Sequence, residues 1–228
     1  MLYLHETIDV RPDRVDELAP RLAELYLPVM ERAGARFVAL WETVPICLPW
    51  PRFVALWEVD SIQAVSGVVR ARYATEREGF ARWRRALGEV ATSVEGRMLT
   101  PSARTPSLAD LRAGGPPLTM VVHEWITVRQ NQGESYCKQL ETRYAPYTSI
   151  FNRQFVGTYH EVWNNKEVIN IWALPDAYTV FPGGEITANN VAASDEMESW
   201  IVMSVGLREA FHSGLLHQVD LDALGSTA

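Results

Sequence analysis

The residues best suited to chemistry are two histidines at equivalent places in a repeated segment. His5 lies in LHETIDVR at residues 4–11, and His123 lies in VHEWITVR at residues 122–129. An imidazole has a reference pKa of about 6.5, and an apolar wall keeps it neutral and able to accept a proton near neutral pH. This pattern predicts acid/base catalysis. The candidate catalytic residues are His123, His5, His160 and Tyr159.

The elements that must position these side chains are β-strands, whose successive side chains point to opposite faces. On the first predicted strand, His5 shares a face with Tyr3 and Thr7, whereas Glu6 falls among apolar residues that should lie under helices. The histidine face is expected to border an aromatic-walled cavity, the usual form of a small-molecule site. The candidate substrate-binding residues are Tyr3, Thr7, Trp41, Trp57, Trp125 and Trp172. The alternative for each histidine and tryptophan is ordinary core packing.

The chain is a duplication, as a shift of the sequence against itself by 118 residues reveals. Over residues 1–44 the shift gives eleven identities without a gap, where chance would give roughly two or three. Matched pairs at this shift outside the histidine segments include Leu22/Leu140, Tyr26/Tyr144 and Pro28/Pro146. Later in the chain the match weakens but persists, with Trp57/Trp172 at a spacing of 115 and Trp83/Trp200 at 117.

Each half predicts the element order βαββαβ, which is the ferredoxin-like unit. A lone unit leaves one sheet face bare, so we expect an α+β fold in which two ferredoxin-like units pack their antiparallel sheets into a dimeric-α/β-barrel-like core. The predicted parts are residues 1–103, a Pro- and Gly-rich linker at 104–117, and residues 118–228. The predicted strands are residues 2–10, 36–43, 52–59 and 94–99 in the first half, and 119–128, 154–162, 167–174 and 215–219 in the second. The first helix of each half begins near Pro12 or Asn131, and the second helical region ends near Val90 or Ala210.

The hexapeptide FVALWE occurs at residues 37–42 and again at residues 53–58. Each copy is rich in β-branched and aromatic residues, and the ten residues between them contain three prolines. This arrangement predicts a β-hairpin with a stiff loop, in which both copies send Phe, Ala and Trp to one face. The loop tip, residues 45–51, is too apolar for an idle loop, so we predict self-association, with a lid over a cavity mouth as the alternative.

The segments at residues 12–34, 36–43 (RFVALWET), 53–61 (FVALWEVDS) and 96–102 (GRMLTPS) resemble the NIPSNAP family of the dimeric α/β-barrel superfamily. The resemblance covers nearly all of the first half and, more loosely, the second. It implies ferredoxin-like units, a central cavity and homo-oligomers, in a superfamily that includes cofactor-free monooxygenases, cyclases, isomerases and haem enzymes. A haem on the second half would take its axial ligand from His160, His212 or His217.

The second half departs from this pattern in one strand and in the segment LPDAYTVFPGGEITANN at residues 174–190, which replaces a simple helical run. Tyr159-His160-Glu161 stands where the first half has Trp41-Glu42-Thr43. A departure confined to one copy suggests that the second half has been specialised.

Composition and missing motifs exclude several functions. The net charge of −7 and the pI near 5.3 give no basic footprint for nucleic acid or anionic lipid, and no apolar stretch approaches the ~18–20 residues of a membrane span. Cys47 and Cys137 are far apart, which is typical of a reduced cytoplasmic protein. The dipeptide His-Glu occurs three times without an HExxH motif, so we expect no metal site.

These observations together predict a cofactor-independent enzyme. We expect a hydrophobic, aromatic or polyketide-like small molecule to undergo cyclisation, isomerisation or dehydration by proton transfer in an enclosed cavity, as a tailoring step in biosynthesis. The alternatives are a cofactor-free or haem-dependent oxidation in the same space, and a non-catalytic binding or assembly protein. The expected partners are this substrate and further copies of the chain, without nucleic acid or membrane.

Overall fold

The computed structural model of the chain describes residues 1–47, 49–175 and 191–221. It divides into two compact units. Unit 1 comprises Met1–Met98 and the segment that begins at His217, and unit 2 comprises Leu99–Leu216.

The sheet of unit 1 is antiparallel, with β3 between β1 and β2. Its strands are β1 (Leu2–Val10), β2 (Arg36–Thr43), β3 (Arg52–Val59) and the first part of β4 (Ala91–Pro101). The register places His5 opposite Leu56. The segment that follows residue 217 joins this sheet, because the Val219 amide donates a hydrogen bond to the Leu40 carbonyl over 2.8 Å.

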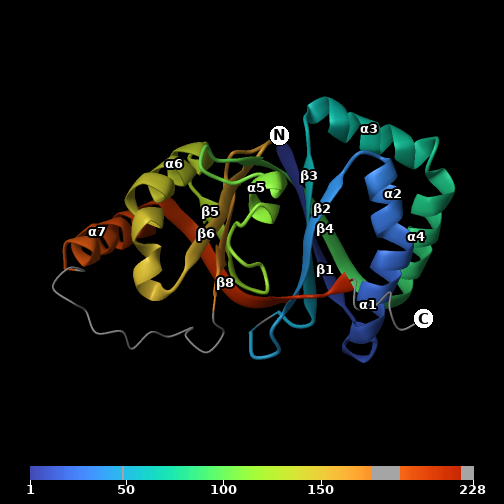
Figure 1. Cartoon of the computed structure of the whole chain (residues 1–228), viewed down its shortest axis with the longest axis horizontal. Helices are drawn as coiled ribbons and strands as arrows, with labels where there is room; N and C mark the ends of the chain where they lie inside the picture. Colours follow the sequence, from blue (N-terminus) through green and yellow to red (C-terminus); the bar gives the residue numbers. More distant parts are fainter. Residues whose placement is uncertain (48, 176–190, 222–228) are drawn as a thin grey trace. The chain divides into compact units, whose positions relative to one another are not determined.

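The helices of unit 1 cover one face of this sheet (Figure 1). They are η1 (Pro12–Arg14), α1 (Val15–Arg21), the π-helical turn η2 (Leu22–Tyr26), α2 (Leu27–Arg32), α3 (Ile62–Tyr73) and α4 (Arg77–Val90). The Ser61 hydroxyl accepts a hydrogen bond from the Ala64 amide and thereby caps the start of α3. The predicted apolar stripe on residues 15–29 is the surface that packs on the sheet, with Leu18, Leu22 and Val29 fully buried.

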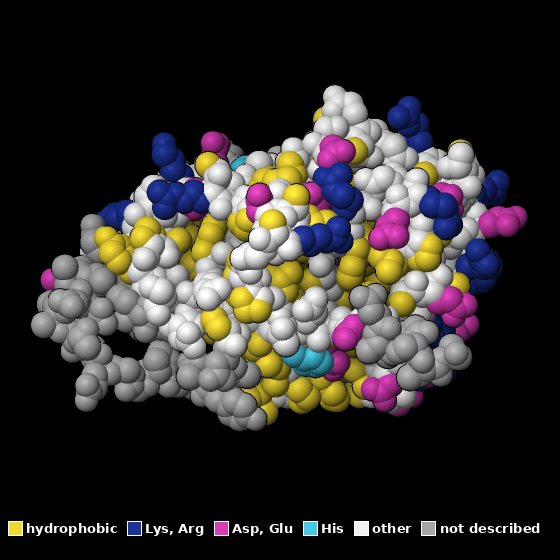
Figure 2. Space-filling model, in the orientation of Figure 1, with side chains coloured by type: hydrophobic (Ala, Val, Ile, Leu, Met, Phe, Trp, Pro, Cys, Tyr) yellow, Lys and Arg dark blue, Asp and Glu magenta, His cyan; other side chains and the backbone are white. Residues whose placement is uncertain are grey.

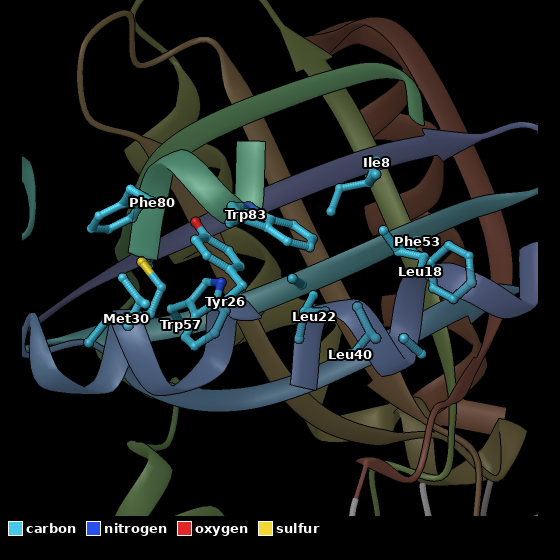
Figure 3. Packing of buried hydrophobic residues seen from close by; sticks show 14 of the residues in the cluster. Ile8, Leu18, Leu22, Tyr26, Met30, Leu40, Phe53, Trp57, Phe80 and Trp83 are labelled. Carbon is cyan, nitrogen blue, oxygen red and sulfur yellow. The ribbon is translucent and has the colours of Figure 1, made fainter. Parts of the chain in front are cut away.

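An aromatic cluster forms the centre of that packing (Figure 3). The rings of Tyr26 and Trp83 stack with their centroids 4.7 Å apart, and Trp57 meets Tyr26 edge-on at 5.4 Å. These contacts join the end of η2 to α4 and β3. Because aromatic pairs are worth about 0.5–1.5 kcal/mol beyond the area they bury, the cluster fixes the helices on the sheet.

Unit 2 repeats the arrangement with strands in the order β8, β5, β7, β6 and the end of β4. Its elements are α5 (Leu108–Arg112), β5 (Met120–Val128), α6 (Gly133–Arg143), η3 (Ala145–Phe151), β6 (Gln154–Glu161), β7 (Glu167–Ala173), α7 (Val191–Leu207) and β8 (Arg208–Gln218). Figure 1 shows α6 and α7 along one side of these strands.

The last strand of each sequence half leaves the unit in which that half begins. The end of β4 pairs with β6, with Leu99 opposite Glu161, and the end of β8 belongs to unit 1. The units therefore differ in extent from the predicted halves 1–103 and 118–228. The predicted linker contains the short helix α5, whose N-terminus is closed by a capping box between Ser107 and Asp110. β8 also begins seven residues before the predicted strand at 215–219.

The two FVALWE copies form the predicted hairpin, because β2 pairs with β3. The predicted facing is confirmed for β3, where Phe53, Ala55 and Trp57 lie under the helices. It is wrong for β2, because a β-bulge shifts the register between Phe37 and Ala39 and turns Leu40, rather than Trp41 or Ala39, towards the helices.

The same bulge recurs in unit 2, between Phe155 and Gly157. These residues are 118 positions after Phe37 and Ala39, so the two halves share an irregularity of the backbone as well as a sequence pattern.

The tip of the β2–β3 hairpin is partly anchored. The Trp50 indole donates a hydrogen bond to Glu42 over 3.2 Å, whereas Ile46 is 88% exposed. Leu48, which also belongs to the predicted contact surface, lies outside the described residues. Self-association through this tip stays a prediction.

In Figure 2, Lys and Arg side chains lie among Asp and Glu side chains mainly over the upper and right parts of the face, and hydrophobic side chains are visible across its middle. Among the described residues, no helix combines the length and the apolar character that a membrane crossing requires.

Gly157 provides a test of the β6 packing. A Cβ at this position would lie 2.5 Å from the Tyr159 hydroxyl oxygen and 2.8 Å from Thr105 Cγ2, and both side chains are buried. Gly157→Ala should therefore lower the free energy of unfolding by roughly 1–3 kcal/mol, measured by urea denaturation. Gly214→Ala on β8, where a Cβ meets nothing within 4 Å, is the control. Equal stabilities of the two variants would contradict the described packing.

Candidate functional site

Each sheet carries a carboxyl group on the face that its helices cover. In unit 1 this group is Glu6 on β1, which accepts hydrogen bonds from the Tyr26 hydroxyl and the Trp57 indole, each over 2.9 Å. Burial raises the pKa of Glu6 above its ordinary range, and the two hydrogen bonds oppose that shift. Glu6 is partly buried, and each of its two carboxyl oxygens accepts one of these hydrogen bonds.

Unit 2 carries the equivalent group, Glu124, among equivalent neighbours. Tyr144 packs edge-on against Trp172 with ring centroids 5.4 Å apart, as Tyr26 does against Trp57. Trp200 on α7 is fully buried, as is Trp83 on α4. A carboxyl group, a tyrosine and two tryptophans are therefore common to both units.

The hydrogen bonds of Glu124 differ from those of Glu6. Glu124 accepts from the Asn170 amide over 2.9 Å, and the Asn170 carbonyl oxygen accepts from the Thr158 hydroxyl over 2.6 Å. Thr158 also contacts the sulfur of Cys137 at 3.3 Å, and burial raises the pKa of that thiol to about 12. The three partners are fully buried, so this polar chain fixes the orientation of the Glu124 side chain from behind.

The matching positions in unit 1 are apolar. Cross-strand pairing places Ala55 opposite Glu6 and Leu40 opposite Ala55, where unit 2 has Asn170 and Thr158. The polar chain behind the carboxyl group is therefore specific to unit 2.

Glu124 borders a cavity of about 270 Å³ in unit 2. Two arginines and several aromatic side chains share its wall. The lining residues are Glu124, Leu140, Tyr144, Arg153, Trp200, Ile201, Arg208, Phe211 and Ser213. In unit 1 the residues that correspond to the two arginines are Ala35 and Ala91.

The correspondence of Arg208 with Ala91 follows from the backbone. The Arg11 amide donates to the Val90 carbonyl over 2.9 Å, and the Arg129 amide donates to the Leu207 carbonyl over 3.1 Å. Ala91 and Arg208 are the next residues and begin β4 and β8.

The two arginines have different partners. Arg153 Nη1 lies 3.9 Å from Glu124 Oε1 and forms a loose ion pair. Arg208 donates from Nε and Nη2 to the Tyr136 hydroxyl over 2.9 and 2.7 Å, and its guanidinium lies 4.7 Å from the centre of the Phe211 ring. Burial and the charge of Glu124 raise the pKa of Tyr144, while Arg153 lowers it, so this phenol stays protonated at neutral pH.

The wall of this cavity is suited to a small aromatic molecule, and its one residue of a haem-ligating type is Tyr144. A pocket of this volume lies just below the ~300–1,000 Å³ range of ligand sites. None of its lining residues is a histidine, cysteine or methionine, the usual axial ligands of haem iron apart from tyrosine. Among the described residues, no three His, Cys, Asp or Glu side chains are grouped to hold a metal ion.

The predicted histidines lie on the opposite sheet faces. His5, Tyr3 and Thr7 alternate with Glu6 and are buried, and Trp41 joins them because it and Thr7 both pair with Val54. The Tyr3 hydroxyl donates to Glu58 over 2.8 Å. In unit 2, His123 and Trp125 alternate with Glu124 in the same way, and the Trp125 indole donates to Glu167.

Several predicted site residues lie elsewhere than expected. Trp57 and Trp172 face the helices rather than the histidine side, because each belongs to the apolar cluster under its own helices. Tyr159 and His160 occupy opposite faces of β6, and His160 pairs with Val168 on the helix side. None of the ten predicted site residues lines the cavity beside Glu124.

Sequence reasoning missed Glu124, Arg153 and Arg208. One signal was present: a glutamate inside the apolar stripe of a strand, repeated in both halves together with Tyr26/Tyr144 and the two tryptophan pairs. The arginines carry no such signal, because they have no counterpart in the first half.

Comparison with solved structures identifies the fold. An anthrone oxidase-like protein matches with a TM-score of 0.68 and 10% identity, over 96% of this chain and 91% of that chain. A putative monooxygenase from Lactobacillus acidophilus NCFM matches with a TM-score of 0.58 and 9% identity, over 95% of this chain and 93% of that chain. At these identities the likeness shows a shared mixed α/β fold alone.

NIPSNAP domain proteins are also among the structural neighbours. One from Burkholderia xenovorans matches 47% of this chain and 100% of that chain, with a TM-score of 0.41 and 20% identity. No protein-family model matches the sequence, and no curated protein matches it. Membership of the NIPSNAP family stays a prediction.

The raised pKa of Glu6 predicts a pH-dependent stability. Between the unfolded pKa, near 4.5, and the higher folded pKa, the folded state binds more protons, so the free energy of unfolding falls as pH rises through this interval. Glu6→Gln removes this titration. The stability of the variant relative to the wild type should therefore be greater at pH 8 than at pH 5, measured by urea denaturation. A difference that is constant with pH would mean that Glu6 ionises as freely in the folded chain as in the unfolded one.

Proposed function

We propose that this chain is an enzyme that binds a small aromatic ketone or phenol in the cavity of unit 2 and removes a proton from its carbon with Glu124. The single observation that carries the proposal is a buried carboxyl group, held by Asn170, at the wall of a cavity with two arginines and aromatic side chains. No cofactor is needed for proton removal from a carbon beside a carbonyl group.

The neighbours of Glu124 suit the charge changes of such a step. As the C–H bond breaks, the proton goes to the Glu124 carboxylate and the electron pair moves to the substrate oxygen, which becomes an enolate or phenolate. Arg153, 3.9 Å from Glu124, is placed to balance this charge as it moves from protein to substrate. The protonated Tyr144 hydroxyl offers a further donor at the same wall.

Proton removal is the common first step of two overall reactions. Return of the proton at another carbon gives isomerisation. Attack of the carbanion on a second carbonyl carbon of the same molecule, whose oxygen then takes up the proton, gives cyclisation. Reaction of the carbanion with O₂ gives oxidation: for anthrone, one O₂ yields anthraquinone and one water, with one oxygen atom in each product. The likeness to an anthrone oxidase-like protein favours oxidation.

We further propose that the chain arose by duplication of a ferredoxin-like unit. Support comes from the Glu–Tyr–Trp–Trp set that both units contain and from the repeated bulge in β2 and β6. On this view, only the second copy opened a cavity beside its carboxyl group.

Anthrone tests the proposal through two readouts. Deuterium uptake at its methylene carbon under nitrogen, followed by NMR, measures proton removal alone, and oxygen consumption in air measures the oxidation. Glu124→Gln keeps the size and the acceptor for Asn170 but removes the base, so both rates should fall by about 10²–10⁴. Glu6→Gln in unit 1 is the matched control, since Tyr26 and Trp57 donate to the two Glu6 oxygens, and it should retain both rates.

The outcomes separate the competing sites. Wild-type rates no greater than those of Glu124→Gln would overturn the proposed reaction. The histidine hypothesis gives the reverse pattern: activity lost in His123→Gln, with a smaller loss in His5→Gln, and kept in Glu124→Gln would place the chemistry on the other face of β5. Deuterium uptake without oxygen consumption would favour an isomerase or cyclase over an oxidase.

A further inference from the structure

Arg208 is a cation in the cavity wall without an acidic partner. Its Nε and Nη2 both donate to the neutral hydroxyl of Tyr136, and no ion pair involves it among the described residues. Glu124, the one acidic residue in the lining, is paired with Arg153. The lining thus contains two positive charges and one negative charge, which leaves an excess of one positive charge beside the ligand space.

Tyr136 holds the guanidinium in a fixed position. The phenol is fully buried and accepts two hydrogen bonds from the same guanidinium, and the Phe211 ring lies against the group 4.7 Å away. Because the guanidinium is planar and rigid, the hydrogen bonds that fix Nε and Nη2 also fix the position of the remaining donor group, Nη1. Such an arrangement binds a carboxylate with little loss of side-chain entropy.

The pair formed by Tyr136 and Arg208 has no counterpart in unit 1. Leu18 and Ala91 occupy the matching positions there, and Leu18 is part of the apolar core. Both members differ together, in the unit that has the cavity. A structural role in holding β8 against α6 does not require an arginine, since unit 1 holds β4 without one.

We propose that Arg208 binds a carboxylate carried by the substrate and that Tyr136 positions Arg208 for this task. The substrate class is therefore an aromatic acid, with its carboxylate at Arg208 and its reacting carbon towards Glu124. This inference rests on the cavity of the proposed function but not on the reaction. On this inference Arg208 binds the permanent negative charge of the substrate, whereas Arg153 stabilises the negative charge that develops during proton transfer.

The test compares two ligands of the same shape, 2-naphthoate and its neutral amide, 2-naphthamide, by isothermal titration calorimetry. The wild type should bind 2-naphthoate more tightly. Arg208→Gln should raise the Kd of 2-naphthoate roughly tenfold or more and leave that of 2-naphthamide nearly unchanged, because only the charge-assisted hydrogen bond is lost. Tyr136→Phe should reduce the preference for 2-naphthoate by a smaller factor, with the ring and its packing retained.

The control is Lys138→Gln, which removes one positive charge from an exposed position on α6 outside the cavity. It should change neither Kd. Thermal unfolding of each variant identifies misfolding: a parallel loss of both ligands together with a lower Tm would assign Arg208 a structural role and overturn the inference.

Three further results are decisive. Equal binding of 2-naphthoate and 2-naphthamide by the wild type would overturn the carboxylate inference and leave the cavity as a binding site. Absence of binding for both ligands would contradict the cavity itself, on which the proposed function also depends. A preference for 2-naphthoate that persists in Arg208→Gln would place the carboxylate at another residue.

Discussion

The hydrogen bonding of one buried carboxyl group in each unit is the constraint on which the surrounding structure depends. A carboxyl group under a layer of helices loses its hydration, which costs several kcal/mol if nothing replaces the water. Unit 1 meets this requirement with Tyr26 and Trp57, whose donors close the space around Glu6. Those same rings join η2, β3 and α4, so the groups that satisfy the carboxyl group also form the centre of the core.

Unit 2 meets the same requirement from a different direction. Asn170, supported by Thr158, supplies the hydrogen bond to Glu124 from the sheet, so the tyrosine and the tryptophan are no longer needed as donors. The Trp172 indole nitrogen accordingly has no hydrogen-bond partner among the described residues, although it is fully buried. Donors supplied from the sheet leave the helix side of the carboxyl group free to face a cavity.

The two arginines are a further difference between the surroundings of Glu124 and those of Glu6. An exposed charge beside a ligand is screened by water, whereas a charge in a partly enclosed aromatic cavity keeps more of its effect. Arg153 and Arg208 stand where unit 1 has alanines, and each has a separate partner. Compared with the matching place in unit 1, unit 2 thus has polar groups behind its carboxyl group and two arginines in front of it.

The sequence by itself determined the element order and the faces of the first strand of each half. Strand periodicity is local, so the alternation of His5 with Glu6, and of His123 with Glu124, could be predicted from neighbouring residues. Only the tertiary structure decided which face carries a cavity. The bulge at residue 38 reverses the alternation of β2, and local periodicity does not reveal it. Arg153 comes from a loop and Arg208 from the start of β8. They line the same cavity as Glu124 only because the folded chain brings these segments together, although Glu124 and Arg208 are 84 residues apart in the sequence. Side-chain types and strand spacing are properties of short segments, whereas a cavity wall is a property of segments that only the folded chain brings together.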